Sequence, residues 1–110
     1  MTEKLAQIDV REHHGIPVVA VAGDIDLSNA HELRDALEQF GTPRAIAIDM
    51  TNLLFIDSTG LNAIAQYGRA VLESGNDVYV IVTRPPLRKL FEITNLDQHF
   101  TVLTSLDDLP

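Results

Sequence analysis

The chain has 110 residues, a length that corresponds to one domain with a single hydrophobic core. Its formal net charge of −8 disfavours direct binding to nucleic acids and to anionic membranes, because both carry negative charge themselves. The absence of cysteine excludes disulfide bonds and thiolate chemistry, and the four histidines show no spacing typical of a metal site.

The N-terminal segment, MTEKLAQIDV, has neither the basic start nor the apolar stretch of a signal peptide. The longest apolar runs of the chain comprise only a handful of residues, whereas a membrane-spanning helix needs about 20. We therefore expect a cytoplasmic protein that does not span a membrane, and we expect no metal or other cofactor.

Two strands joined by a short turn are predicted at the beginning of the chain. Apolar and polar residues nearly alternate from Ala6 to His13, which is typical of a half-buried strand. His14-Gly15 indicates a tight turn between two strands. The almost wholly apolar run from Ile16 to Ala22 predicts a second strand, which should be covered on both faces.

An amphipathic helix is predicted from Asn29 to Phe40. Apolar residues recur in this range at helical spacing, and Gly41 follows as a stop signal. Ser28 and Asn29 are both favourable N-cap residues. Glu32 stands three residues after Asn29, as in a capping box.

A buried strand is predicted from Ala45 to Met50, and a second helix begins within or just after the segment FIDSTGL. This helix is indicated by a stripe of small and apolar residues that ends near Gly75. The members of the stripe are Leu61, Ile64, Ala65, Gly68, Val71 and Leu72.

The last third of the chain predicts a strand, a helix and a short final strand. The run from Val78 to Val82 is rich in β-branched residues and typical of a buried strand. Pro86 suits the first turn of a helix, because the N–H groups of that turn have no partner within the helix and proline lacks this group. Asn95 suits the left-handed position that ends such a helix, and Phe100 to Leu103 predicts the last strand.

The predicted order is β-β-α-β-α-β-α-β, which indicates a single α/β domain over residues 1–110. Strands separated by helices favour right-handed parallel crossovers, so we expect a mixed, mostly parallel sheet of four or five strands covered by helices. Functional groups of such sheets gather beyond the carboxyl ends of the strands. The polar residues that the chain places there are Asp24, Asp26, Asp49, Asp57, Ser58 and Arg84.

The segment Asp57-Ser58-Thr59-Gly60 admits two interpretations. In the first it caps a helix: Asp57 accepts a hydrogen bond from the N–H of Gly60 or Thr59, and Ser58 is the first helical residue. In the second, Ser58 receives a phosphoryl group of about −1.5 to −2 charges, which the free N–H groups of a helix start accommodate. Such a group leaves the fold intact and disrupts an interface made with the hydroxyl form.

Other chemistries find little support in the sequence. There is no GxSxG segment of a serine hydrolase and no GxxxxGK[ST] phosphate loop. Asp24 and Asp26 suggest the Mg²⁺ site of a receiver domain, but that site also needs a lysine near the last strand. The only lysines are Lys4 and Lys89. The two aspartates are more simply explained as turn and cap residues, with contact to a partner as the alternative.

Three segments of the chain are similar to consecutive parts of one known family. The first segment, GDIDLSNAHELRDAL, resembles the family's acidic turn and first helix. The second, AIAIDMTNLLFIDSTGL, resembles its strand, loop and phosphorylation motif. The third, LFEITNLDQHF, resembles its third helix and the following turn. The similarity covers nearly the whole chain in order. The chain thus resembles the STAS domain, and in particular the bacterial anti-sigma factor antagonists.

This resemblance implies a binding protein rather than an enzyme. Unmodified members of the family bind an anti-sigma factor that is also a serine kinase, and they thereby free the sigma factor. Phosphorylation of the motif serine releases the antagonist, and a PP2C-type phosphatase restores it. Ser58 matches the phosphoacceptor, and the resemblance places Asp24, Asp57, Thr59 and Gly60 on the partner-binding surface together with it.

The chain also departs from the family pattern, and rival functions remain open. Asn62 stands where many members have Gly, Asn95 replaces a common Gly, and many members continue into a final helix beyond the position of Pro110. One rival is a constitutive interaction module on the same fold, either a scaffold in stress signalling or a small subunit of a lipid-transport ATPase. The other is a nucleotide-binding or nucleotide-hydrolysing protein, which the absence of a phosphate loop disfavours.

Overall fold

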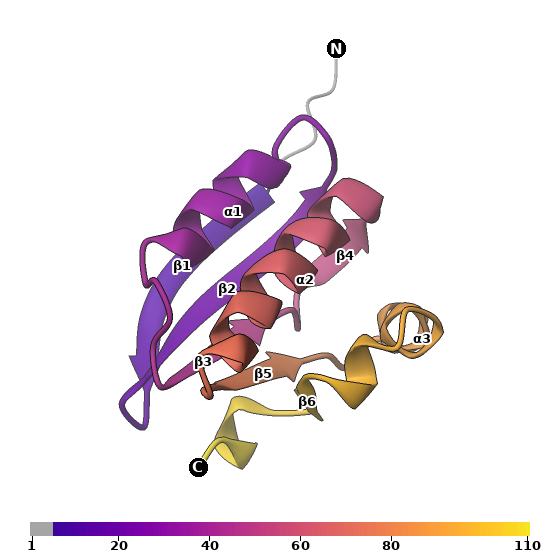
Figure 1. Ribbon diagram of the computed structural model, residues 1–110. Helices are drawn as coiled ribbons and strands as arrows, with labels where there is room; N and C mark the ends of the chain where they lie inside the picture. The colour runs from indigo at the N-terminus through magenta and orange to yellow at the C-terminus, as the bar shows by residue number, and fades with distance from the viewer. Residues whose placement is uncertain (1–5) are drawn as a thin grey trace.

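The computed structural model describes residues 6–110, which form a layered α/β structure (Figure 1). Within this range it contains six strands and three α-helices, with two short 3-10 helices near the C-terminus. The elements in chain order are β1 (Ala6–His13), β2 (Ile16–Ile25), α1 (Ala30–Glu38), β3 (Ala45–Asp49), β4 (Leu53–Ile56), α2 (Ser58–Glu73), β5 (Asp77–Ile81), α3 (Pro85–Ile93), η1 (Leu96–Gln98), β6 (Thr101–Leu103) and η2 (Leu106–Asp108).

One sheet holds all six strands of the described chain. β1 runs antiparallel to β2, whereas the pairs β2–β3, β3–β5 and β5–β6 are parallel. The order across the sheet is β1-β2-β3-β5-β6, and β4 pairs in parallel with β2 outside this path. The predicted mixed, mostly parallel sheet covered by helices is therefore confirmed.

The prediction of four or five strands missed β4 and ended β2 too early, at Ala22. β3 pairs with Val18–Ala20, and the three further residues of β2, Gly23–Ile25, pair with β4. The ten-residue strand β2 is thus long enough to hold two successive neighbours on one side. β4 is a segment of four residues whose middle residues, Leu54 and Phe55, are exposed, and it forms a strand because it pairs with the distant end of β2, which no local pattern indicates.

Most of the predicted turns and helix ends agree with the structure. His14 and Gly15 have φ values of 53° and 79°, as the predicted tight hairpin requires, and Asn95 takes the predicted left-handed conformation with φ 61°. α1 is shorter than predicted, because the chain leaves the helix after Glu38. The N–H of Phe40 already bonds to the oxygen of Leu37, three residues back, as in a turn.

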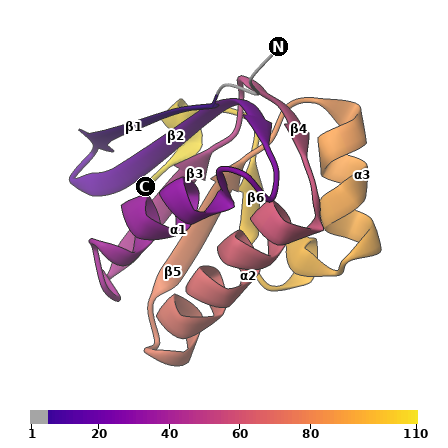
Figure 2. The same ribbon diagram turned by 90° about the horizontal axis from the view of Figure 1, so that it is seen from above.

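The main hydrophobic core lies between the sheet and the helices α1 and α2, which cover the same face (Figure 2). The predicted stripe of α2 takes part in it, and Gly68 makes room for an aromatic ring: a Cβ at this position would lie 2.6 Å from Cε1 of Phe100. Side chains that are fully enclosed in this core include Val19, Ile25, Leu33, Leu37, Ile46, Ile48, Ile64, Val71 and Val80.

The opposite face of the sheet is covered in part by the C-terminal segment. Leu109 is buried there in a second, smaller cluster with Val18, Ala47 and Ile81. The side chain of His14 contacts the same segment, because its Nδ1 lies 3.2 Å from the backbone oxygen of Leu109. The hairpin of β1 and β2 and the C-terminus are therefore joined on this face.

Tyr67 places a polar atom in the main core without a partner. Its side chain packs among the core residues and only 7% of the residue is exposed. The hydroxyl is buried and has no hydrogen-bond partner in the described chain. Because burial disfavours the charged phenolate, it raises the pKa of Tyr67 from 10.0 to about 12.

We expect Tyr67→Phe to leave stability at pH 7 unchanged or to raise it, since the substitution removes a buried hydroxyl that gains no hydrogen bond. Between pH 10 and about 12 the unfolded tyrosine loses its proton while the folded one keeps it, so the stability of the parent chain falls with rising pH in this window. The phenylalanine variant lacks this contribution. Urea unfolding of both chains across pH 7–12 measures the difference.

Tyr79→Phe is the matched control, because Tyr79 is the only other tyrosine of the chain and is only half-buried. A loss of more than about 1 kcal/mol at pH 7 in Tyr67→Phe would contradict the expectation and indicate that the hydroxyl is bonded in solution.

Candidate functional site

The start of α2 has the geometry of the predicted helix cap. Asp57 is the N-cap residue, and its Oδ1 accepts a hydrogen bond of 3.0 Å from the N–H of Gly60. Its backbone oxygen accepts from the N–H of Leu61, also at 3.0 Å. Ser58 is the first helical residue, and both Ser58 and Thr59 are exposed. The first of the two interpretations, the cap, is therefore confirmed, and it leaves the hydroxyl of Ser58 facing solvent.

Gly60 sets how closely α2 approaches the sheet. The residue is buried, and a Cβ on it would lie 2.5 Å from Cγ2 of Ile25 and 2.8 Å from Cγ1 of Ile56. These two isoleucines are paired neighbours at the ends of β2 and β4. The helix therefore begins directly on the carboxyl ends of both strands. The N–H of Asp57 fixes it there by donating to the oxygen of Ile25 at 3.0 Å.

The loop between β2 and α1 forms the second part of the site. The carboxylate of Asp26 accepts hydrogen bonds from the N–H and the hydroxyl of Ser28, at 2.9 Å and 2.5 Å. Asn29 is buried and bonds twice within the loop: its Nδ2 donates to the oxygen of Asp24, and its Oδ1 accepts from the N–H of Asp26, both at 2.9 Å. Asp26 is thus a turn residue, as predicted, whereas the same prediction is wrong for Asp24, which lies in β2 and pairs with Phe55.

The predicted capping box between Asn29 and Glu32 is not formed. Asn29 does occupy the N-cap position, but its side chain makes no capping hydrogen bond. Both of its polar atoms are used to hold the preceding loop in place, and the carboxylate of Glu32 is left at the surface. The physical reason is that a buried amide forms its hydrogen bonds where the loop offers buried partners.

The two parts of the site meet around a shallow hollow of about 510 Å³. Asp24 and Phe55 are paired neighbours in β2 and β4, so the loop after β2 lies beside the segment that leads to Ser58. Large apolar side chains are exposed here: Leu27 is 78% and Phe55 46% accessible. The hollow is lined by Asp26, Leu27, Ser28, Phe55 and Asp57.

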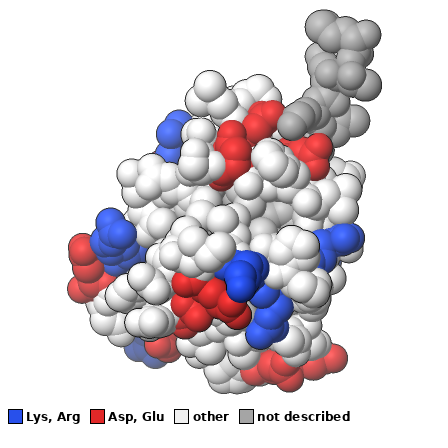
Figure 3. Space-filling model, turned by 90° about the vertical axis from the view of Figure 1, so that its right-hand side faces the viewer, with Lys and Arg blue, Asp and Glu red and all other residues white. Residues whose placement is uncertain are grey.

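Exposed apolar groups next to carboxylates are typical of a surface that binds another protein. Figure 3 shows one side of the molecule, on which acidic and basic side chains both lie among uncharged surface. Sequence reasoning identified the acidic residues and missed Leu27 and Phe55. The available signal was a leucine in a loop of polar residues, whereas the exposure of Phe55 follows only from the position of β4.

Two of the residues predicted at this edge have other roles. Asp49 is buried, and its carboxylate bonds to Nη2 of Arg11 at 3.2 Å and to the N–H and hydroxyl of Thr51 at 3.0 Å and 2.6 Å. It therefore holds the turn from β3 to β4. Arg84 is exposed at the N-cap position of α3. Neither residue lines the hollow beside Ser58.

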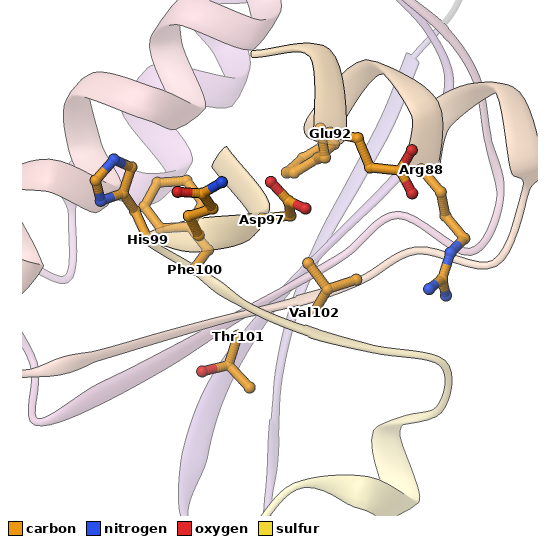
Figure 4. Close-up of a pocket in the computed structure, with 9 residues that line it drawn as sticks. Arg88, Glu92, Asp97, His99, Phe100, Thr101 and Val102 are labelled. Atoms are coloured by element: carbon orange, nitrogen blue, oxygen red, sulfur yellow. The ribbon is translucent and has the colours of Figure 1, made fainter. Parts of the chain in front are cut away.

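A second hollow of about 490 Å³ lies between α3, η1 and β6 (Figure 4). It carries charges of both signs: Glu92 and Asp97 line it together with Arg88, whose Nη1 lies 3.3 Å from the oxygen of Val82. Within residues 6–110 no group of three or more potential ligands is arranged to hold a metal ion, and no helix is long and apolar enough to cross a membrane.

Comparison with known proteins gives a consistent result. The model of the STAS domain matches residues 7–109. The anti-sigma-F factor antagonist RsfB of Mycobacterium tuberculosis is 28% identical over 104 residues, which cover 92% of this chain and 84% of that protein.

Solved structures agree with this similarity. An anti-sigma factor antagonist from Mycobacterium paratuberculosis has a TM-score of 0.85 and 29% identity, with 94% and 90% of the two chains covered. The phosphorylated form of the Bacillus cell fate determinant SpoIIAA has a TM-score of 0.72 and 17% identity, with 92% and 95% covered, and shares the fold.

Gly60→Ala is expected to destabilise the fold by about 1–3 kcal/mol, because the added methyl group has to displace the packed side chains of Ile25 and Ile56. Thr59→Ala is the control in the same helical turn. Thr59 is exposed, and its substitution should change stability by no more than about 0.5 kcal/mol. Urea unfolding followed by circular dichroism compares the two, and equal midpoints would show that α2 does not rest on the strand ends as closely as described.

Proposed function

The chain belongs to the STAS domain family, and on this premise we propose that it is an anti-sigma factor antagonist controlled by phosphorylation of Ser58. In this proposal the unphosphorylated chain binds an anti-sigma factor with serine kinase activity and frees the sigma factor. Phosphorylation ends the complex, and a PP2C-type phosphatase restores the binding form. The observation that carries the proposal is the exposed hydroxyl of Ser58 at the start of α2, beside an apolar and acidic hollow.

The helix start can carry a phosphate without a change of fold. The first N–H groups of a helix have no partners inside the helix and attract anions. Asp57 already engages the N–H groups of Gly60 and Leu61, so those of Ser58 and Thr59 remain for the phosphate oxygens. The relative SpoIIAA, which has the same fold, was solved in a phosphorylated form. This supports a switch that acts at the surface.

The same phosphate disrupts an interface formed over the hollow. It adds about −1.5 to −2 charges next to Asp57 and near Asp26, in a region where Leu27 and Phe55 lie exposed. A partner that has buried these apolar groups would also have to bury a dianion beside carboxylates. Burial of an unpaired charge costs several kcal/mol, so the complex dissociates.

The proposed partner-binding residues differ in what they contribute. Asp24, Asp57, Ser58 and Thr59 present polar groups at or near the surface. Gly60 is buried and takes part indirectly, because its close packing fixes the position of Ser58. The acidic surface around them favours a partner with a basic face, which also accelerates association.

A constitutive interaction module is the second candidate. One observation favours it: the Asp57 cap by itself accounts for a small polar residue at position 58, without any modification. The two candidates differ in their partner. A serine-kinase anti-sigma factor recovered with the chain supports the switch, and the ATPase of a transporter supports the module.

The switch is tested by Ser58→Ala and Ser58→Asp. We expect Ser58→Ala to bind the anti-sigma factor as the parent does and to stay bound when ATP is added, because it has no phosphoacceptor. We expect Ser58→Asp to bind about tenfold or more weakly, since it places a charge in the interface. Affinity is measured by calorimetry, and phosphorylation by intact-protein mass spectrometry with fragmentation across residues 52–69.

Thr59→Ala is the matched control, because Thr59 carries the neighbouring exposed hydroxyl. It should still be phosphorylated and released. Equal binding by the alanine and aspartate variants of Ser58, or phosphate on Thr59 in place of Ser58, would refute the proposed switch.

The docking surface is tested by Leu27→Ala and Phe55→Ala. Each substitution should weaken binding of the anti-sigma factor by about tenfold, because exposed apolar side chains at the centre of an interface contribute most of its free energy. The change in stability should be small, since Leu27 is 78% and Phe55 46% accessible, and circular dichroism checks that both variants fold. Ile93→Ala is the control: Ile93 is 68% accessible on α3, outside the hollow, and its loss should leave affinity unchanged. A larger effect at Ile93 than at Leu27 and Phe55 would move the interface elsewhere.

A further inference from the structure

β1 lies at the margin of the sheet and has one free edge. In the part of the chain that the structure describes, β1 pairs with β2 alone, and its other side lies next to no strand (Figure 1). The strand has eight residues, and Val10 at its middle is 47% accessible. A long edge strand with an exposed apolar residue offers unpaired N–H and C=O groups to another strand.

The hairpin determines which backbone groups face this free edge. His14 and Gly15 form a two-residue turn, and His13 and Ile16 flank it as a pair. In such a hairpin the flanking residues exchange hydrogen bonds with each other, and the direction of the groups then alternates along the strand. The N–H and C=O groups of the even-numbered residues, with Val10 at the centre, therefore point away from β2.

The side chains of β1 alternate between the two faces of the sheet, and one face carries charges of both signs. Asp9 and Arg11 lie on the sheet face that also carries Asp49, where all three line one small hollow. Asp9 forms no ion pair with the described chain, and the side chain of Arg11 is 54% accessible although one of its nitrogens contacts Asp49. Ile8 packs toward the main core on the other face. An acid and a base thus stand one residue before and one residue after Val10.

From this arrangement we propose that a second copy of this chain pairs with β1, antiparallel and about a two-fold axis at Val10. Val10 then lies opposite Val10 of the second copy, and Ile8 opposite Glu12. Asp9 lies opposite Arg11 twice, once on each side of the axis. The outward backbone groups of Val10 meet as a hydrogen-bonded pair, so the backbone and the charges select the same register.

The neighbouring registers are unfavourable. An axis at Asp9 places two aspartates directly opposite each other, and an axis at Arg11 does the same with two arginines. An axis between two residues pairs an outward backbone group with an inward one, which the antiparallel ladder does not allow. Charged residues on an edge strand usually prevent pairing with other chains. In β1 the charged residues of one copy are instead complementary to those of a second copy related by a two-fold axis.

A cysteine cross-link tests the register, because the natural chain has no cysteine. In the proposed dimer the two Cα atoms at position 10 are about 5.5 Å apart, which suits a disulfide. Those at position 12 are about 14 Å apart, because they are offset by four residues along the strands and lie on two neighbouring strands. Val10→Cys should therefore form a covalent dimer under mild oxidation, and Glu12→Cys, also exposed on β1, should not. Equal or inverted cross-linking would overturn the proposal.

Charge exchange tests the contacts in solution. Sedimentation velocity of the parent chain from about 10 µM to 1 mM should show a dimer that weakens with salt, as expected for a small interface. Asp9→Arg should weaken it by about tenfold or more, since two attractive pairs become repulsive. Asp35→Arg makes the same charge change on the exposed face of α1 and should have no effect.

Mixing Asp9→Arg with Arg11→Asp should restore the dimer, because both cross-strand pairs then join opposite charges again. Arg11→Asp also removes the ion pair with Asp49, so the folding of this variant is checked by circular dichroism. If Arg11→Asp does not fold, the comparison of Asp9→Arg with Asp35→Arg decides the test. A parent chain that stays monomeric at 1 mM, or an Asp9→Arg variant that dimerises as the parent does, would refute the pairing.

Discussion

The length of β2 is the constraint on which the rest of the structure depends. This ten-residue strand pairs with β1 along one side and, on its other side, first with β3 and then with β4. Because β4 occupies the last part of β2, the chain reaches the carboxyl end of the sheet before α2 begins. The helix start is thereby placed over the ends of two strands, where Gly60 allows contact with Ile25 and Ile56. The exposure of Ser58 follows from this placement.

The N–H groups at the start of α2 matter both for the stability of the helix and for the proposed function. Asp57 uses its carboxylate and its carbonyl oxygen to bind the N–H groups of Gly60 and Leu61. The helix is therefore already capped when Ser58 is unmodified, and a phosphate would add to the cap without replacing it. For this reason a large change of surface charge requires little change of structure. The opposing loop is also held by internal hydrogen bonds, since the buried Asn29 joins the backbone of Asp24 to that of Asp26.

Local signals were sufficient where the cause of a feature is local. The turn at His14-Gly15, the left-handed Asn95 and the cap at Asp57 were all predicted from a few neighbouring residues, and the structure confirms them. β4 was missed because its existence depends on the length of β2, far away in the sequence.

The role of Asn29 was assigned incorrectly for a related reason. The amide could bond to its own helix or to the loop before it, and burial decided in favour of the loop. The hollow beside Ser58 unites residues of two separate segments, so its apolar members, Leu27 and Phe55, could not be recognised before the segments were brought together.

The two surfaces that we assign to protein binding are independent in space. Val10 pairs with Val19, and Asp24 lies five residues further along β2, which corresponds to about 17 Å. In an antiparallel dimer the two Ser58 regions therefore lie at opposite ends, separated by several Debye lengths of about 8 Å. A phosphate on one copy would not be felt electrostatically by the other, so each copy would switch by itself. A β1-paired dimer would thus present two binding sites to its partners, and the strength of the complex would depend on how many of the two serines are unmodified.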